Sequence, residues 1–282
     1  MGEPERMDRE MDAFYKACRP YTIPGKGKGF KIADKDRSGS RIYCISVRKG
    51  GVMWVKMVST GIKGLDWMLG GGIPQGYLVS VIGSCGTGKT TLGLHFIYEG
   101  LKNGEKCLII SFDEDEEGII QTAEGYGMKF SSYSDNLVVV RLDAEEVKRK
   151  VEGFEDHLKR IFENLRPSRV LIDPLTILET LFDEAGRYSF LSKIRSIIKE
   201  IGATAIITGE SSIEKPSNSK FGIMEYVSDG MIVLKTYREN ELDEAILSVE
   251  IIKMRRVGHQ RKPRPFTISD HGIEVFEESE LM

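Results

Sequence analysis

The feature that most constrains this chain is the glycine-rich stretch at residues 83–90, which lies between apolar runs at residues 77–82 and 91–98. It fits the pattern G-x-x-x-x-G-K-[ST] in the strand–loop–helix setting that this motif requires. The glycines let successive backbone N–H groups converge on a phosphate chain at the positive end of the following helix. The stretch therefore predicts an ATP site formed by Gly83, Ser84, Cys85, Gly86, Thr87, Gly88, Lys89, Thr90 and Thr91.

Two residues of this phosphate loop have roles that follow from their chemistry. Lys89 can reach the terminal phosphates, and the hydroxyl of Thr90 is available to Mg²⁺. The alternative is a chance match in a glycine-rich chain. It is disfavoured because the strand, the loop, the lysine and the threonine all agree. ATP and Mg²⁺ are therefore the expected cofactors.

Charge separates the beginning of the chain from the rest. Residues 1–56 contain 13 Lys and Arg against 7 Asp and Glu, although the 282-residue chain has a net charge of -3. We therefore expect a basic, partly flexible leader at residues 1–56 and an ATPase domain at residues 57–282. Within the leader, residues 7–18 have helical apolar spacing and residues 42–47 are typical of a strand. The Lys/Gly run at 25–29 is interpreted as a solvated linker rather than a nucleic-acid contact.

Cysteine usage and hydropathy bear on the cellular setting. The four cysteines form no C-x-x-C pair, and Cys85 lies inside the phosphate loop. Disulfide and zinc frameworks are therefore disfavoured, and a reducing cytoplasm is expected. No apolar run approaches the length of a membrane span, and the first residues lack the apolar segment of a signal peptide. The prediction is a cytoplasmic protein without a membrane partner.

Apolar strands alternate with helices through most of the body. The pattern predicts strands at 77–82, 106–112, 137–141, 169–173 and 203–208, and helices near 65–69 and at 116–126, 145–164 and 187–201. Such strands indicate a mostly parallel central sheet covered by helices on both faces, with ligands at the carboxyl ends of the strands. Beyond residue 225 the helices stop, and partly antiparallel strands follow at 226–234, 246–253, 266–268 and 273–276. The predicted fold class is α/β with C-terminal antiparallel strands.

Acidic residues after two of these strands are the candidates for metal and water chemistry. Asp173 ends a buried strand, where it can hold Mg²⁺ with Thr90; the alternative is an Asp that caps a turn before Pro174. Asp113 and Glu114 follow the strand at 106–112, which we expect to lie close to the phosphate-loop strand. Both are candidates to orient or deprotonate the attacking water. The acids at 115–117 are interpreted as the first turn of a helix, where they favour the dipole.

Cations near the end of the chain form the third group. Lys253 and Arg255 share one face of a strand because side chains alternate, so both can point at one anionic target. Two such cations can neutralise a transferring phosphoryl group. A nucleic-acid patch and a solvated hairpin remain alternatives, since six basic residues occur from 253 to 264 without an acid. His259 has no partner at metal-ligand spacing.

Taken together, these motifs resemble the KaiC-like branch of the RecA/RadA superfamily of P-loop ATPases. Beyond the phosphate loop, the resemblance is carried by residues 65–66, 69–76, 111–115, 226–230, 252–255, 259 and 265–272. It covers roughly residues 57–277 in the right order. It implies a RecA-like P-loop core, with ATP bound between adjacent subunits of a ring that is usually a hexamer.

The same resemblance implies roles for single residues. Asp113 and Glu114 match the pair of acids that handles water, and Thr90 and Asp173 match the magnesium site. Lys253 and Arg255 match a pair that reaches the phosphates of the neighbour's ATP. His259, Ser269 and Asp270 align with positions that approach the neighbour's nucleotide. Asp113 replaces the first Glu of the family's pair and is one methylene shorter, so slow turnover is expected.

The favoured function is a single-domain, slowly hydrolysing MgATPase with a regulatory or signalling role, self-assembled into a ring homo-oligomer. No clock function is inferred, because the sequence has one phosphate loop and lacks the tandem arrangement of the circadian protein. A RadA-like DNA-binding recombination accessory and a non-hydrolysing, nucleotide-sensing scaffold remain alternatives. A nucleic-acid partner is not favoured, because no helix-hairpin-helix module or separate DNA domain precedes the core.

Overall fold

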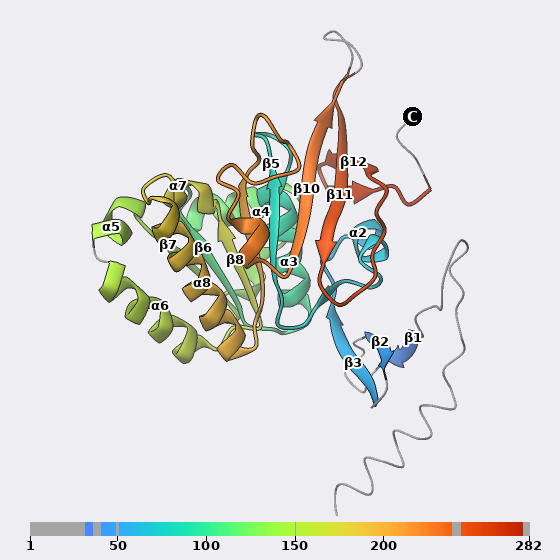
Figure 1. Ribbon diagram of the computed structural model, residues 1–282, viewed down its shortest axis with the longest axis horizontal. Coiled ribbons are helices and arrows are strands. Elements are labelled where there is room, and N and C mark those ends of the chain that lie inside the picture. Colours follow the sequence, from blue (N-terminus) through green and yellow to red (C-terminus); the bar gives the residue numbers. More distant parts are fainter. Residues whose placement is uncertain (1–31, 36–40, 49–50, 150, 239–243, 279–282) are drawn as a thin grey trace, which may run out of the picture.

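The computed structural model describes residues 32–35, 41–48, 51–149, 151–238 and 244–278 (Figure 1). The helix predicted at residues 7–18 and the Lys/Gly run at 25–29 lie outside the described residues. None of the helices within these ranges is long and apolar enough to cross a membrane.

A nine-stranded sheet forms the centre of the molecule, in the order β13-β12-β11-β10-β5-β9-β8-β6-β7. The six strands from β10 to β7 are parallel, whereas β11, β12 and β13 each pair antiparallel with the strand before them in sequence. This confirms the predicted fold class. The strands are β5 (Leu78–Gly83), β6 (Cys107–Ser111), β7 (Leu137–Arg141), β8 (Arg169–Asp173), β9 (Thr204–Glu210), β10 (Gly230–Tyr237), β11 (Ile246–Met254), β12 (Arg264–Ser269) and β13 (Gly272–Val275).

Helices cover both faces of this sheet (Figure 1). Alternate residues of β5 face opposite ways: Val79 and Val81 belong to one apolar cluster, and Leu78 and Ile82 to the other. The first cluster includes residues of α3 and α4, and the second includes residues of α6 and α8. The helices are α2 (Lys63–Met68), α3 (Lys89–Lys102), α4 (Glu116–Gly125), α5 (Ala144–Arg149), α6 (Val151–Leu165), α7 (Leu175–Glu179), α8 (Glu184–Ile201) and α9 (Met224–Val227), with a 3₁₀ turn at Phe130–Tyr133.

A smaller sheet precedes the central one. It consists of β1 (Ile32–Lys35), β2 (Arg41–Arg48), β3 (Gly51–Val58) and β4 (Ile73–Pro74), all paired antiparallel. The strand predicted at 42–47 therefore lies within β2. The last pairing, Met57 with Pro74 and Val58 with Ile73, joins β3 to the segment that leads into β5.

Three local expectations were wrong. The helix predicted at 145–164 is two helices, α5 and α6, on either side of residue 150. The strand predicted from 226 begins at Gly230, after α9, because Met224 and Val227 are three residues apart and bury one face of a helical turn. The expected proximity of the strand at 106–112 to the phosphate-loop strand also fails, since β9 and β8 lie between β6 and β5.

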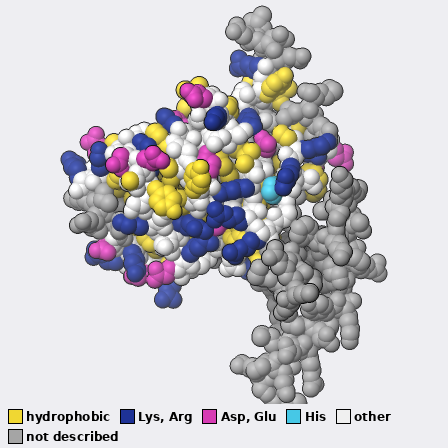
Figure 2. Space-filling view, viewed as in Figure 1, with side chains coloured by type: hydrophobic (Ala, Val, Ile, Leu, Met, Phe, Trp, Pro, Cys, Tyr) yellow, Lys and Arg dark blue, Asp and Glu magenta, His cyan; other side chains and the backbone are white. Residues whose placement is uncertain are grey.

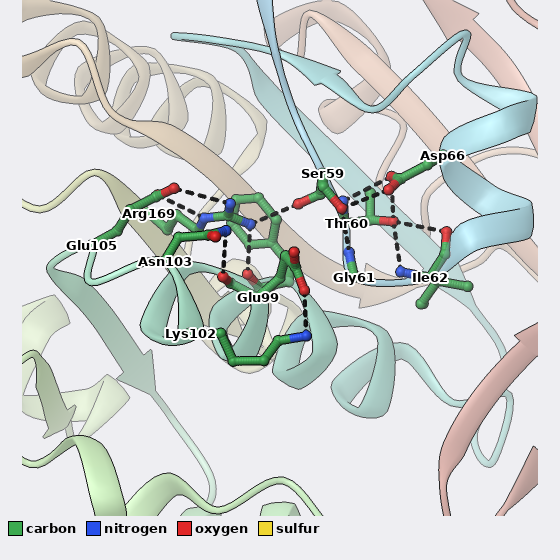
Figure 3. Close-up of polar contacts among 11 residues, drawn as sticks. Ser59, Thr60, Gly61, Ile62, Asp66, Glu99, Lys102, Asn103, Glu105 and Arg169 are labelled. Atoms are coloured by element: carbon green, nitrogen blue, oxygen red, sulfur yellow. Dashed lines mark hydrogen bonds and ion pairs between the residues drawn. The ribbon is translucent and has the colours of Figure 1, made fainter. Parts of the chain in front are cut away.

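A buried guanidinium group joins β8 to α3 and to the loops that contain Ser59 and Glu105 (Figure 3). Arg169, at the start of β8 and 1% exposed, donates from Nε to Glu105 Oε2 at 2.8 Å. Its Nη1 donates to the carbonyls of Ser59 at 2.7 Å and Phe96 at 2.8 Å, and the group lies 4.8 Å from the centre of the Phe96 ring. Its Nη2 donates to Glu105 Oε1 at 3.2 Å, so each nitrogen of the group has a partner, which offsets the cost of burying the charge.

The neighbouring turn into α2 is organised around the half-buried carboxylate of Asp66 (Figure 3). Asp66 accepts hydrogen bonds from Ser59 Oγ at 2.6 Å, Thr60 N at 2.8 Å and Thr60 Oγ1 at 2.7 Å. Burial raises the pKa of Asp66, although these bonds oppose the rise. The Leu65-Asp66 dipeptide of the sequence motif therefore fixes the chain just ahead of the central sheet.

Candidate nucleotide site

The phosphate loop connects β5 to α3 as predicted. Gly86 and Gly88 have φ angles of 76° and 83°, a region that favours glycine. A Cβ atom at Gly88 would lie 2.6 Å from Ile268 Cδ1, and one at Gly83 would lie 2.6 Å from Thr87 Oγ1. The loop therefore requires these glycines both for its backbone conformation and for its close packing against β12.

Lys89 begins α3 directly after the loop. Its ammonium group donates to the carbonyls of Gly83 at 3.0 Å and Ser84 at 2.8 Å. Burial lowers the pKa of Lys89, and the negative charges of Asp173 and Glu210 oppose that fall. The ammonium group of Lys89 therefore lies against the phosphate loop, with Asp173 and Glu210 close enough to affect its pKa.

Thr90 and Asp173 meet at the same edge, which we call the carboxyl edge because the parallel strands end there. Thr90 Oγ1 donates to Asp173 Oδ2 at 2.9 Å, and Thr208 Oγ1 donates to Asp173 Oδ1. Asp173 caps no helix: Pro174 is the N-cap of α7 and makes no side-chain capping bond. Burial raises the pKa of Asp173, and these hydrogen bonds with the charge of Lys89 oppose the rise.

This donor set fits Mg²⁺. A hydroxyl and a carboxylate are the hard oxygen ligands that Mg²⁺ prefers, and the ion uses one or two protein groups with substrate phosphates. Both groups lie next to a loop that is ready for those phosphates. Thr90 and Asp173 are therefore the residues that would hold the ion.

Asp113 and Glu114 also lie at the carboxyl edge, although their strand is next to β8 and not close to the phosphate-loop strand as expected. Ser111 is in register with Asp173 across the β6–β8 pair, so the two acids follow the strand beside Asp173. The Asp113 charge contributes to the raised pKa of Asp173. Asp113 is exposed, whereas half-buried Glu114 accepts a hydrogen bond from Thr122 at 3.4 Å.

Glu210 is a residue of this edge that the sequence analysis missed. It ends β9 in register with Gly83, and its charge acts on the pKa of Lys89. Its carboxylate pairs with Lys220 at 2.6 Å. The rule that selected Asp173, an acid at the end of a buried strand, could have found Glu210. The strand was expected to end at Thr208, two residues too early.

Lys253 and Arg255 lie at the opposite edge of the sheet, which we call the amino edge. Met254 is in register with Gly230, and Gly230 with Val79, whereas the phosphate loop follows Gly83. Four residues of β5 separate the two positions, roughly 13 Å at 3.3 Å per residue. The structure therefore does not bring these cations to the phosphate loop of their own chain.

At the amino edge both cations are held mainly by backbone carbonyls. Lys253 Nζ donates to the carbonyls of Glu225 and Ser228, the latter at 2.8 Å. Arg255 Nη2 donates to the Tyr226 carbonyl at 3.2 Å. Burial lowers the pKa of Lys253, and the charge of Arg255 lowers it further.

The other residues that the resemblance singles out, His259, Ser269 and Asp270, do not lie at the same edge. His259 follows β11 near the end of α2, where the adjacent Gln260 N donates to the Met68 carbonyl at 2.8 Å. Burial lowers the pKa of His259. Ser269 ends β12 one residue after Ile268, which packs beside Gly88, so Ser269 and Asp270 lie near the phosphate loop of their own chain.

The strand order, the phosphate loop after β5 and the Thr90–Asp173 contact define a RecA-type P-loop nucleotide-binding domain. The sequence model of the KaiC ATPase family matches residues 58–280. The chain therefore belongs to the KaiC family of ATPases.

Individual relatives agree with this placement. The chain is 31% identical over 232 residues to the circadian clock oscillator protein KaiC of Synechococcus elongatus, covering 79% of this chain and 44% of that protein. It is 33% identical over 235 residues to KaiC of Thermostichus vulcanus, with coverage of 79% and 44%. The chain thus spans less than half the length of these relatives. A solved KaiC-like protein of Pyrococcus horikoshii OT3 has 30% identity and a TM-score of 0.69, with coverage of 79% and 99%.

Proposed function

We propose that residues 57–282 bind MgATP and hydrolyse it slowly at sites that a second copy of the chain completes, in a ring homo-oligomer expected to be a hexamer. The observation that carries this proposal is the division of the candidate residues between two edges. The phosphate loop, Thr90 and Asp173 occupy the carboxyl edge, whereas Lys253 and Arg255 lie at least roughly 13 Å away at the amino edge.

In this proposal the carboxyl edge holds the substrate and the water. The loop amides and Lys89 bind the phosphates, and Thr90 with Asp173 holds Mg²⁺. Bound Mg²⁺ would neutralise charge on the phosphate oxygens. Asp113 and Glu114 orient a water molecule and accept its proton as the water oxygen bonds to the terminal phosphorus and the bond to ADP breaks.

The amino edge of the neighbouring copy supplies the positive charge that the transition state needs. Lys253 and Arg255 of that copy neutralise the transferring phosphoryl group, and a cation of this kind contributes about 10³- to 10⁵-fold in rate. Turnover then depends on assembly. A slow, assembly-dependent ATPase suits a regulatory or signalling role better than bulk hydrolysis.

The cellular setting is part of the proposal. Cys85 is exposed in the phosphate loop and Cys107 is buried, and both are free thiols. Burial raises the pKa of Cys107 to about 12, which keeps that thiol protonated and unreactive. Free thiols of this kind suit a reducing cytoplasm.

Subunit mixing tests the division directly. Lys89→Ala should prevent nucleotide binding but leave the amino edge intact, whereas Arg255→Ala should bind nucleotide but fail to complete the neighbour's site. Each variant alone should be inactive, and a mixture should regain phosphate release because the first variant supplies Arg255 to the second. Arg261→Ala, which removes an exposed cation of the same basic run, is the matched control. A mixture as inactive as its components would contradict the shared site.

A further inference from the structure

The amino edge carries more positive charge than Lys253 and Arg255 alone. Figure 2 shows Lys and Arg side chains gathered over α8 and α9, beside hydrophobic side chains. A groove here is lined by Tyr188, Ser192, Arg195, Ser196, Lys199, Tyr226 and Val227. We call the groove together with Arg255 the basic–aromatic surface.

One buried acid organises these cations. Asp229, with a side chain 5% exposed, lies 2.9 Å from Arg195 Nη2, 3.1 Å from Lys199 Nζ and 3.8 Å from Arg255 Nη1. Three cations thus share one carboxylate, and their side chains remain 33%, 42% and 45% exposed. Asp229 therefore fixes the three cations in place, and the surface keeps a net positive charge that a partner can contact.

Two tyrosines make this surface unlike an ordinary solvated charge patch. Tyr226 is 71% exposed and Tyr188 is 56% exposed, at the rim of the same groove. Exposed tyrosines and arginines together are typical of surfaces that another macromolecule covers.

A surface of opposite charge lies at the carboxyl edge. A shallow hollow on α4 is lined by Asp115, Glu116, Glu117, Ile120, Gln121 and Glu124, and the catalytic candidates Asp113 and Glu114 come just before it. Residues 113–128 contain no Lys or Arg. We call this the acidic α4 surface, and it adjoins the half of the site that awaits a neighbour's cations.

We propose that the basic–aromatic surface of one copy binds the acidic α4 surface of the next copy, so that α8 and α9 guide Lys253 and Arg255 into the neighbour's nucleotide site. This inference rests on the proposed function and names the contact that delivers the shared cations. Because the two surfaces lie at opposite edges of one sheet, the contact is head-to-tail, the kind that closes into rings. Complementary charge selects the partner and its orientation.

Paired charge reversals test the contact. The acid-side variant carries Glu116→Lys and Glu117→Lys, and the base-side variant carries Arg195→Glu and Lys199→Glu. Each variant alone sets like charges against each other at every contact, so the assembled fraction with MgATP should fall about tenfold or more. In an equal mixture each contact joins opposite charges if the copies alternate. The mixture should therefore form rings of even subunit number and regain phosphate release, both measurable by native mass spectrometry and a phosphate assay.

Controls separate this contact from folding and from the proposed function. Lys159→Glu with Arg160→Glu makes the same charge change on exposed positions of α6 and should assemble normally. Lys199→Glu alone keeps the bond between Arg195 and Asp229, so it serves as the test if the double variant does not fold. This single variant should also weaken assembly, and the acid-side variant should rescue it.

The outcomes are distinct. Variants that assemble and turn over like the unmodified chain would overturn this inference and leave the shared site standing. A chain that hydrolyses ATP as a monomer would overturn both proposals. Base-side variants that keep their rings but lose binding to single-stranded DNA would assign the basic–aromatic surface to nucleic acid instead, which also overturns the inference.

Discussion

The two edges of the central sheet hold their polar side chains in different ways. At the carboxyl edge, side chains from different elements bind one another: Thr90 and Thr208 donate to Asp173, and Lys220 pairs with Glu210. At the amino edge, Lys253 bonds to backbone carbonyls; Arg195, Lys199 and Arg255 also share Asp229, but their side chains stay 33%, 42% and 45% exposed. The polar groups of the first edge hold one another in place, whereas the second edge presents charge outward. Each is one half of the proposed active site.

The largest expected effect comes from the outward-facing half. Arg255→Ala should lower phosphate release about 10³-fold or more, because the transition-state charge loses a cation from the neighbour. Binding of a fluorescent ATP analogue should change little, since the phosphate loop is untouched. A matching loss of nucleotide binding would show that the two edges are not separate in function.

A smaller loss is expected from the carboxyl edge. Asp173→Asn keeps the shape and the contact with Thr90 but removes the negative charge that Mg²⁺ needs, so turnover at fixed Mg²⁺ should fall about 10²-fold. Raising the Mg²⁺ concentration should recover part of the activity. Turnover that ignores both the substitution and the Mg²⁺ concentration would remove Asp173 from the metal site.

The edges should also respond to pH with opposite signs. Burial raises the pKa of Glu179, which follows the carboxyl edge on α7, to about 7 from 4.5, and the charge of Arg187 opposes the rise. Between pH 4.5 and about 7 the folded state keeps a proton on Glu179 that the unfolded state has lost. The stabilising contribution of this group is therefore fully present below pH 4.5 and is lost as the pH rises to about 7. The loss should be on the order of 3 kcal/mol.

Asp229 at the amino edge behaves in the reverse way. Burial raises its pKa, but hydrogen bonds from Leu78 N, Arg195 and Lys199 outweigh burial and hold it below 3.8. Its stabilising contribution is therefore present above pH 3.8 and is lost only as the pH falls further. Chemical denaturation of Glu179→Gln across pH 2 to 8 separates the two groups: the loss on the neutral side should disappear and the acid-side loss should remain. A neutral-side slope that persists would assign it to another residue.

The smallest expected effect is a gain. Asp113→Glu restores the methylene that this chain lacks relative to the family's acid pair, so turnover should rise by about two- to tenfold if reach to the water limits the rate. Glu114→Asp shortens the neighbouring acid and is the matched control, which should lower turnover. A fall in both variants would show that Asp113 has the length this site needs.

The sequence allowed the fold class and the phosphate loop to be predicted because both depend on local patterns. The apolar run of β5, which is buried along its whole length, and the glycine spacing of the loop are visible in a few neighbouring residues. The Thr90–Asp173 contact was also predictable, since strand ends of a parallel sheet meet at one edge.

What escaped prediction depends on strand order and on distant partners. The sequence does not reveal that β8 and β9 lie between β6 and β5, or that Lys253 and Arg255 stand at the opposite edge from the loop. Arg195 reaches Asp229 from a helix 34 residues earlier, a contact that no local spacing encodes. The acidic α4 surface was interpreted only as the first turn of a helix. The basic–aromatic surface, its proposed counterpart, is formed by tertiary packing and cannot be seen in the sequence.

The buried guanidinium of Arg169 gives the two nucleotide-binding elements a common anchor. It stands at the first residue of β8, whose last residue is Asp173, and it bonds to the Phe96 carbonyl within α3, whose first residue is Lys89. The first residue of the strand is therefore joined to the middle of the helix, away from Asp173 and Lys89. We expect that joint to fix the gap between the Asp173 carboxylate and the Lys89 ammonium group, so a change at residue 169 should alter the alignment of the proposed site without touching the nucleotide.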